Sequence, residues 1–326
     1  MKIGLIDVDG HNYPNLPLMK LSAWHKKQGD SVEWYQPLFS GHMDKVYMSK
    51  VFSFTPDYEY FIDADEIHKG GSGYAIHLID GKEVYDKEKD QPLPYEIEHM
   101  YPDYSLYPEQ TGWGKPLKEQ TAYGFLSRGC PRGCGFCHVA AKEGKCSVKV
   151  ADLSEFWDGQ KNIVLCDPNI LACPDWKDLL QQLIDSKAWV DFNQGLDIRL
   201  MTDEKADMIR QIKVKRVHFA YDNYEDKDFI EPMFEKFARV TGWKHEKVCV
   251  YVLTNYDTTL EQDLHRIMFL RRLEFNPDVR IYDKEHTKVT DDVRRLQRWV
   301  NSRQIFWTVP TFEEYDTRIR NNKKGA

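Results

Sequence analysis

Apolar and polar positions in the middle of the chain follow two alternating periodicities. Short apolar runs, typical of buried strands, are separated by segments whose apolar residues recur at helical spacing. One helix is expected from about Pro174, one after Thr202, which suits an N-cap, and one over 259–273. Because strands that alternate with helices usually pair in parallel, the pattern predicts an α/β fold. The predicted strands are 123–127, 163–165, 189–192, 217–220, 248–253 and 279–282.

The first third of the chain shows a similar alternation. Residues 2–8 form an apolar strand pattern, and Asn15 suits the N-cap of a helix with Pro17 in its first turn. Strand–helix–strand order predicts a doubly wound sheet, ahead of a connecting segment at 86–118 that is rich in Pro and Tyr. Further strands are expected at 31–35 and 45–52, and a glycine turn at 70–73.

Composition supports a globular protein. The 326 residues, of which 41% are hydrophobic, suffice for one large domain or two ordinary ones. A mean hydropathy of -0.63, with no apolar run near 20 residues, argues against a membrane-spanning helix. The start lacks the basic flank and cleavage site of a signal peptide, so we expect a cytoplasmic protein.

Charge is distributed unevenly along the chain, with a formal total of -7. Residues 1–118 hold 12 Lys, no Arg and 19 acidic residues, whereas residues 284–326 hold 10 basic and 6 acidic residues. The total argues against a generally basic nucleic-acid binder. The break in composition predicts an N-terminal domain at 1–118, a second domain at 119–283 and a tail at 284–326.

The cysteines carry the strongest chemical signal. There are seven, an odd number, and none precedes Cys130. Without an export signal, metal binding or catalysis is expected rather than a disulfide framework. Cys130, Cys134 and Cys137 fall within eight residues, and Gly133 and Gly135 between them allow the backbone to curl. Three thiolates on such a loop can point at one centre.

This spacing leaves three explanations open. A structural zinc site usually has four ligands in two separated pairs, and a second pair is missing here. His138 adjoins Cys137, and neighbouring residues rarely both reach one ion. An iron–sulfur cluster held by three cysteines keeps one iron open for a substrate, and the spacing favours this explanation. The third is a loop whose cysteines have only a structural role.

The segment 124–137, GFLSRGCPRGCGFC, resembles the signature loop of the radical S-adenosylmethionine (SAM) superfamily. The likeness includes the spacing, the preceding strand and the aromatic Phe136 before the last cysteine. It implies a [4Fe–4S] cluster on Cys130, Cys134 and Cys137, whose open iron chelates SAM, with Phe136 at the SAM site. It also implies that a flavodoxin- or ferredoxin-like reductant supplies the electron that cleaves SAM into a 5′-deoxyadenosyl radical. The substrate is not indicated.

In that superfamily the loop follows the first strand of a partial (β/α)6, TIM-like barrel, and residues 119–283 can be read in this way. Ligands bind at the carboxyl edge of such a barrel. By resemblance, Asp167 or Asn169 meets the SAM amino group, although the usual Gly-Gly-Glu is absent there. Gln194, Asp197 and Asp222 are candidates for the ribose or the substrate. Asp and Asn also favour turns and caps, which is the alternative explanation for each.

Residues 1–118 resemble the cobalamin-binding domain that precedes many radical SAM barrels. In that domain an Asp-x-His-x-x-Gly loop follows the first strand. Here Asp9 and His11 match, but Pro14 replaces the glycine. The resemblance makes His11 a candidate cobalt ligand and leaves a cobalamin-dependent methyltransferase as an alternative. The glycines at 70–73 are also explained by a tight turn.

The tail is expected to carry one helix capped by Thr290. Its basic and aromatic residues suit contact with RNA or DNA, which leaves a non-catalytic metal-binding, nucleic-acid-interaction module as a further alternative. The charge excess is only four, so a helix that closes the open side of the barrel is favoured. The expected apolar face is Val293, Leu296, Trp299 and Val300, with Arg294, Arg295 and Arg298 outward.

Overall fold

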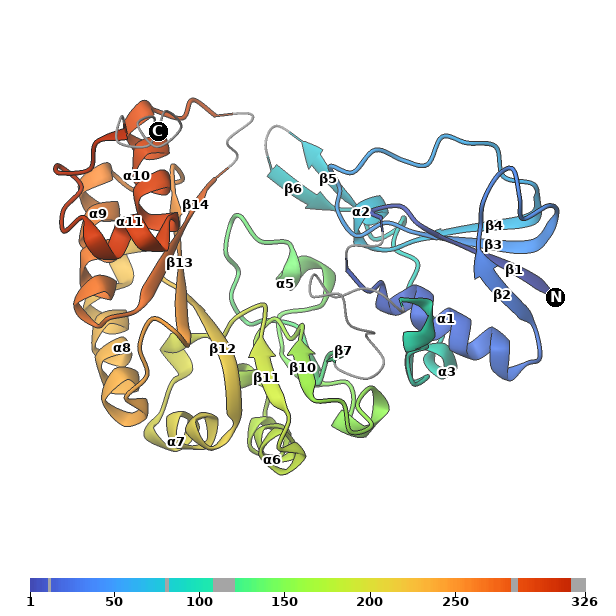
Figure 1. Cartoon of the computed structure of the whole chain (residues 1–326), viewed down its shortest axis with the longest axis horizontal. Coiled ribbons are helices and arrows are strands. Elements are labelled where there is room, and N and C mark those ends of the chain that lie inside the picture. The colour runs from blue at the N-terminus through green and yellow to red at the C-terminus, as the bar shows by residue number, and fades with distance from the viewer. Residues whose placement is uncertain (11–12, 80–81, 108–120, 283–286, 318–326) are drawn as a thin grey trace, which may run out of the picture. The chain divides into compact units, whose positions relative to one another are not determined.

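The computed structural model describes residues 1–10, 13–79, 82–107, 121–282 and 287–317 (Figure 1). By packing, the chain forms two compact units, residues 1–191 and 192–326. Parallel strands alternate with helices in both, so the α/β class expected from the sequence is confirmed. The domain limits expected at 118 and 283 stay predictions.

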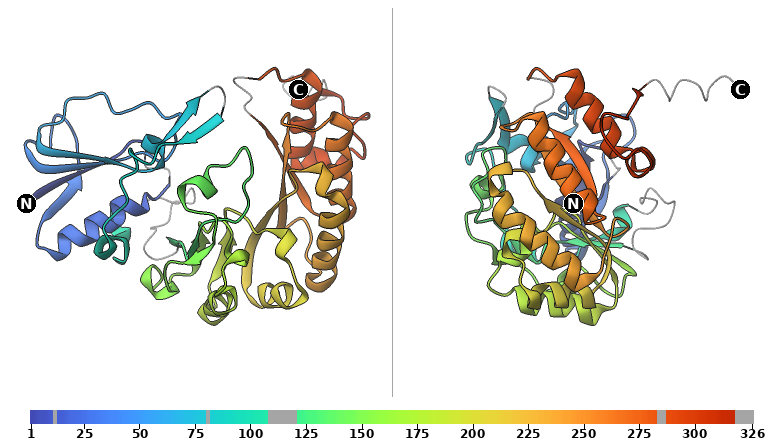
Figure 2. Two further views of the ribbon diagram at one scale, coloured as in Figure 1. Left: turned by 180° about the vertical axis from the view of Figure 1, so that it is seen from behind. Right: turned by 90° about the vertical axis from the view of Figure 1, so that its left-hand side faces the viewer.

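The N-terminal sheet is built from β1 (Lys2–Asp7), β2 (Ser31–Trp34), β3 (Met43–Ser49) and β4 (Ala64–Gly70). The strand order is β2-β1-β3-β4, and every neighbouring pair is parallel. Helix α1 (Leu16–Lys27) connects β1 to β2 and lies along one face of the sheet (Figures 1 and 2). The other face carries an apolar cluster that the connection between β3 and β4 covers, with Tyr58 and Ile62 packed against it.

The glycine turn after β4 has a packing role. Gly71 has a φ of 97°, and a Cβ there would lie 2.3 Å from the carbonyl oxygen of Lys50. A Cβ on Gly73 would lie 2.7 Å from the carbonyl oxygen of Phe52. Both positions therefore need glycine because the turn packs directly on the backbone at 50–52.

The remaining elements of residues 1–191 follow β4 along the chain. Strand β5 (Ile76–Ile79) pairs antiparallel with β6 (Lys82–Tyr85), and β8 (Ser127–Arg128) with β9 (Val148–Lys149). Strand β7 (Thr121–Gly124) pairs in parallel with β10 (Asn162–Leu165). The other elements are α2 (Ser72–Ala75), α3 (Tyr95–Glu98), α5 (Val139–Lys142), α6 (Trp176–Ser186), β11 (Trp189–Phe192) and the 3₁₀ turns Tyr104–Leu106, Leu153–Glu155 and Ile170–Ala172.

The larger sheet of the described chain has the order β14-β13-β12-β11-β10-β7, so its strands follow one another as they do in the sequence. All six strands expected between 119 and 283 are present, within a few residues of their predicted limits. In the second unit, β12 (Lys213–Ala220), β13 (Val248–Thr254) and β14 (Asn276–Ile281) pair in parallel. Each strand contains the apolar run that predicted it, and residues of these runs are buried, such as Ile163, Val190 and Val217.

Helices α7 (Asp203–Gln211), α8 (Lys227–Thr241) and α9 (Leu260–Arg272) lie on one face of β12–β14 (Figures 1 and 2). Thr202 and Thr259 accept hydrogen bonds from the backbone at Lys205 and Gln262, so both are N-caps. Short 3₁₀ turns span Ile198–Leu200 and Tyr224–Asp226. Nowhere in the described part of the chain is there a helix with the length and apolar character needed to cross a bilayer.

The tail forms α10 (Asp291–Asn301), capped by Thr290, and α11 (Arg303–Thr308). All four predicted apolar positions of α10 are buried, and the helix packs against β14. Arg294 and Arg298 are exposed as expected. Arg295 instead donates to the carbonyl oxygens of Phe312 and Tyr315, at 2.7 and 2.6 Å. Arg295, Phe312 and Tyr315 are therefore engaged in internal packing. These are among the tail residues that stacking on a nucleic acid would use.

Candidate functional site

The cysteine loop is closed at its base by a short antiparallel pair. Ser127 in β8 pairs with Lys149 in β9, and Arg128 pairs with Val148. Just inside this pair, the backbone N–H of Cys130 donates to the carbonyl oxygen of Gly144 at 3.1 Å. The loop that carries the three motif cysteines therefore leaves and rejoins the fold at one fixed point.

Gly129 permits this closure. Its φ is 90°, and a Cβ built on it would lie 2.0 Å from the carbonyl oxygen of Cys146. No side chain can replace the hydrogen there without moving the backbone across the loop. The sequence alone did not single out this glycine, because its role depends on the contact with a residue 17 positions later.

The three motif cysteines lie on the outer part of the loop, Cys130 and Cys134 half-buried and Cys137 exposed. A turn joins the last two, with the N–H of Cys137 donating to the carbonyl of Cys134 at 3.1 Å. All seven cysteines are free thiols, as expected for a chain without a disulfide framework. Over the described residues, however, no three His, Cys, Asp or Glu side chains converge closely enough to hold a metal ion.

The donor set of this loop still fits a thiolate-bound metal. The amide Nδ2 of Asn169 donates to Sγ of Cys130 at 3.5 Å, and such hydrogen bonds orient the ligands of metal sites. Asn169 is buried, at 2% exposure, and its carbonyl oxygen accepts from Ser147 at 2.9 Å. The chemistry of three thiols with a buried amide donor fits an iron–sulfur cluster, whereas the side-chain arrangement does not by itself form a metal-holding group.

Asp167 anchors the strand that leads into the loop. Its Oδ1 accepts from the backbone N–H and the hydroxyl of Ser127, at 2.5 and 2.7 Å, and its Oδ2 accepts from the N–H of Leu126 at 3.0 Å. Burial raises the pKa of Asp167 to about 6 against the effect of these hydrogen bonds. The carboxylate expected to meet SAM is thus directed at the backbone, and it positions the loop.

Neighbouring side chains of the loop are paired with other parts of the unit. Nδ1 of His138 lies 2.6 Å from Oε2 of Glu83. The guanidinium of Arg128 stacks 4.0 Å from the centre of the Phe125 ring and lies 3.5 Å from Glu143. Phe136 is half-buried on the loop. These contacts tie the loop to other parts of the unit.

The other cysteines divide by burial. Cys173 and Cys249 are buried, as expected for small hydrophobic residues, and Cys146 is exposed. Cys166 follows β10, and its N–H donates to the carbonyl of Gly124 at 2.9 Å. Burial raises the pKa of the Cys166 thiol to about 12, which keeps it protonated at neutral pH.

The three remaining barrel candidates lie in the second unit. Gln194 is exposed. Asp197 is buried and forms an ion pair with Arg199, Oδ1 to Nε at 2.8 Å, so its carboxylate is used within the unit. Asp222 accepts from the N–H of Leu253 at 3.1 Å, and burial raises its pKa to about 6. Of the three, Gln194 has the side chain most open to solvent.

Arg266 holds together the strand ends beside Asp222. It is fully buried and donates to the carbonyl oxygens of Tyr221, Asp222 and Leu253, the first at 2.5 Å. It also forms an ion pair with Asp263 at 2.5 Å. The sequence analysis missed this residue, although the spacing of Asp263 and Arg266 on one predicted helix is a usable signal.

We expect the stability of the second unit to depend on the ionisation of Asp222. Between the usual pKa of 3.8 and the folded value of about 6, the folded state holds a proton that the unfolded state has lost. The protonated Asp222 therefore contributes fully to the free energy of unfolding below about pH 4. This contribution is lost as the pH rises through about 6. Asp222→Asn keeps an oxygen that can accept from Leu253 but does not ionise. The fall in the free energy of unfolding between pH 4 and pH 7 should therefore be smaller by up to about 3 kcal/mol in this variant.

The measurement is the free energy of unfolding by urea, taken from pH 4 to pH 7. Asp228→Asn is the matched control, because the Asp228 side chain is 91% exposed. The control should follow the wild-type curve. An Asp222→Asn curve with the same slope as wild type would contradict the burial argument.

The cobalamin candidate His11 stays a prediction. It lies outside the described residues. Asp9 accepts hydrogen bonds from the backbone N–H groups of Val51 and Phe52 and, at 2.6 Å, from the hydroxyl of Thr55. Asp9 therefore organises the connection after β3, and the glycines at 70–73 have the packing role described above.

Comparison with protein-family models and with characterised proteins finds no match to this chain. A function for this chain must therefore be inferred from the loop, the strand that precedes it and the side chains around it.

Proposed function

We propose that the chain is an enzyme of the radical SAM type, with a [4Fe–4S] cluster bound by Cys130, Cys134 and Cys137 and with SAM as its second cofactor. We further propose that β7 is the first strand of a partial (β/α)6 barrel. When bound, such a cluster supplies the electron that cleaves SAM into methionine and a 5′-deoxyadenosyl radical. This radical would remove a hydrogen atom from a substrate whose class the chain does not indicate.

One observation supports this proposal above the others. The chain runs from β7, the first of the successive strands of the larger sheet, through β8 into the C-x3-C-x2-C loop, which β8 and β9 close at its base. Ligands bind at the carboxyl ends of parallel strands, so the thiols are near the edge where such chemistry is expected.

The residues around the loop have distinct roles in this proposal. Asn169 orients Cys130 by donating its amide N–H to Sγ, and Asp167 fixes the entry of the loop through Leu126 and Ser127. Gly129 allows the loop to close against Cys146. The Gly-Gly-Glu that is usual in the superfamily at this place is absent after β10, and none of these three roles requires it.

Anoxic reconstitution tests the proposal. Protein treated with iron and sulfide should contain about four of each per chain. Dithionite and SAM should then yield 5′-deoxyadenosine and methionine in equal amounts, measured by mass spectrometry. Protein that binds both cluster and SAM but never cleaves SAM would contradict it. So would protein that instead retains one zinc ion per chain and assembles no cluster.

A further inference from the structure

The N-terminal sheet carries a second candidate site that the cysteine chemistry does not use. An open cavity of about 670 Å³ lies at the carboxyl ends of β1 and β2, where the segment 56–60 forms the remaining wall. This volume is within the range of small-molecule sites. In open parallel sheets, ligands bind outside the carboxyl ends of the strands, beside the point where the strand order reverses. In the order β2-β1-β3-β4 that point lies between β1 and β3, so the cavity at the ends of β1 and β2 is next to it.

Aromatic rings form much of the cavity wall. Trp34 ends β2 and Tyr35 follows it, and Tyr58 and Tyr60 come from the connection between β3 and β4. The rings of Tyr58 and Tyr60 lie 5.4 Å apart, and Tyr60 is 72% exposed. Such π faces attract cations as well as flat apolar groups. Tyr58 is half-buried, and its ring is part of this wall.

The charged residues that line the cavity are acidic. Asp7, Asp57 and Glu59 line it, and none of its lining residues within the described chain is basic. Asp57 is neutralised by Lys69 at 2.8 Å and also bonds the hydroxyl of Tyr74. Asp7 accepts from the hydroxyl of Tyr107 at 2.7 Å, and Glu59 makes no ion pair with any described residue. Two carboxylates are therefore available to a cationic ligand.

We propose that this cavity binds a small organic cation, with its ammonium group at Glu59 and Asp7 and its aromatic or apolar body against the rings. Ammonium groups bind carboxylates through charge-assisted hydrogen bonds and are attracted to tyrosine and tryptophan faces. Phosphate-bearing ligands meet no basic partner in the same wall. The site is separate from the cysteine loop, so its test does not depend on the proposed SAM chemistry.

Three ligands with one indole ring and different charges test the proposal: tryptamine, which is cationic, tryptophol, which is neutral, and indole-3-acetate, which is anionic. Calorimetric titration of the full chain at pH 7.5 should show tryptamine binding about tenfold more tightly than tryptophol. Indole-3-acetate should bind more weakly than either. No binding of tryptamine at millimolar concentration, or equal affinity for all three, would overturn the proposal.

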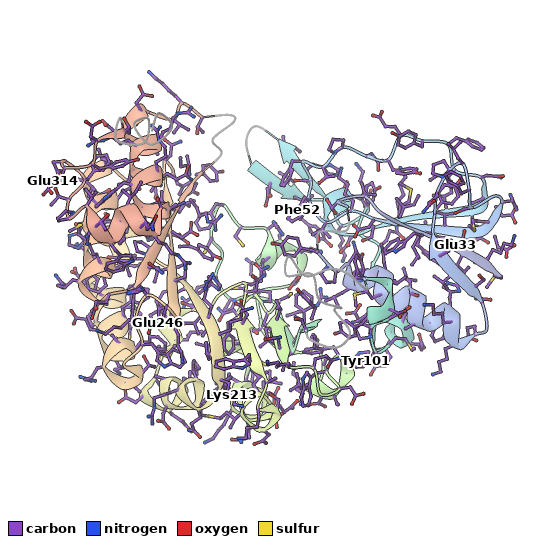
Figure 3. The ribbon with its side chains drawn as sticks, viewed as in Figure 1. Glu33, Phe52, Tyr101, Lys213, Glu246 and Glu314 are labelled. Carbon is purple, nitrogen blue, oxygen red and sulfur yellow. The ribbon has the colours of Figure 1, made fainter. Side chains whose placement is uncertain are left out.

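Matched variants locate the binding. Glu59→Gln and Tyr60→Ala should each weaken tryptamine binding about fivefold. Glu33→Gln removes the same charge from an exposed position on β2 outside the cavity wall (Figure 3), and Phe61→Ala removes an exposed ring next to Tyr60. Both controls should bind as wild type. Equal losses in controls and cavity variants would show that the ligand does not occupy this cavity.

Discussion

Replacing Cys130, Cys134 or Cys137 with Ala, one at a time, should reduce 5′-deoxyadenosine formation to background. In the proposed site each thiolate binds a separate iron, and two remaining thiolates cannot hold the cluster with one iron left open. Iron and sulfide content after anoxic reconstitution should fall together with the activity. The two quantities are measured on the same preparations, so that loss of the cluster can be distinguished from loss of SAM cleavage.

Cys146→Ala is the matched control, because Cys146 is an exposed thiol on the same loop but outside the motif. It should retain both cluster and activity. If Cys146→Ala instead loses the cluster, a fourth protein thiolate occupies the position that SAM requires, and the proposed chemistry is wrong. Retention of activity by any of the three motif variants would also contradict it.

The larger sheet could be predicted from the sequence because its strands are short apolar runs with a clear boundary at each end. Val217 and Val250, for example, are fully buried in β12 and β13. A strand covered on both faces has no polar alternation that could be mistaken for a helix pattern. The cap at Thr202 was equally readable, because an N-cap side chain acts on the backbone two or three residues later.

Two elements could not be predicted in this way. Strand β4 (Ala64–Gly70) lies at the edge of its sheet and is largely exposed, so its sequence ADEIHKG has almost no apolar signal. Helix α8 (Lys227–Thr241) contains Pro232, which interrupts the pattern of a helix that packs through Phe234 and Phe237. In both cases tertiary contacts supply what the local sequence lacks.

The site shows a similar division. The sequence placed Asp167 and Asn169 correctly at the carboxyl end of a strand, but it gave no information on where their side chains turn. Asp167 accepts hydrogen bonds from the backbone of Leu126 and Ser127, and Asn169 donates to Cys130, 39 residues earlier in the chain. Such pairings depend on the register between β7 and β10. Local periodicity does not contain this information.

Gly129→Ala should be the most damaging small substitution in the loop. The new methyl group would lie 2.0 Å from the carbonyl oxygen of Cys146, at a backbone φ of 90°. Backbone atoms on both sides must move, so we expect a loss of at least about 3 kcal/mol in the free energy of unfolding. The contact that closes the loop beside Cys130 should be lost as well, and with it the ability to assemble a cluster.

Gly144→Ala separates the two causes, because Gly144 has a φ of 96° but no atom within 4 Å of a built Cβ. Gly144→Ala introduces only the strain of a positive φ, so it should lower the free energy of unfolding by about 1–2 kcal/mol. Gly133→Ala, with neither a positive φ nor a close neighbour, should change stability by less than about 0.5 kcal/mol. Urea unfolding of the three variants under reducing conditions, followed by iron analysis after reconstitution, gives the comparison. Equal costs at Gly129 and Gly144 would mean that the close approach to Cys146 does not constrain the loop, and the cluster-forming role of this closure would then be wrong.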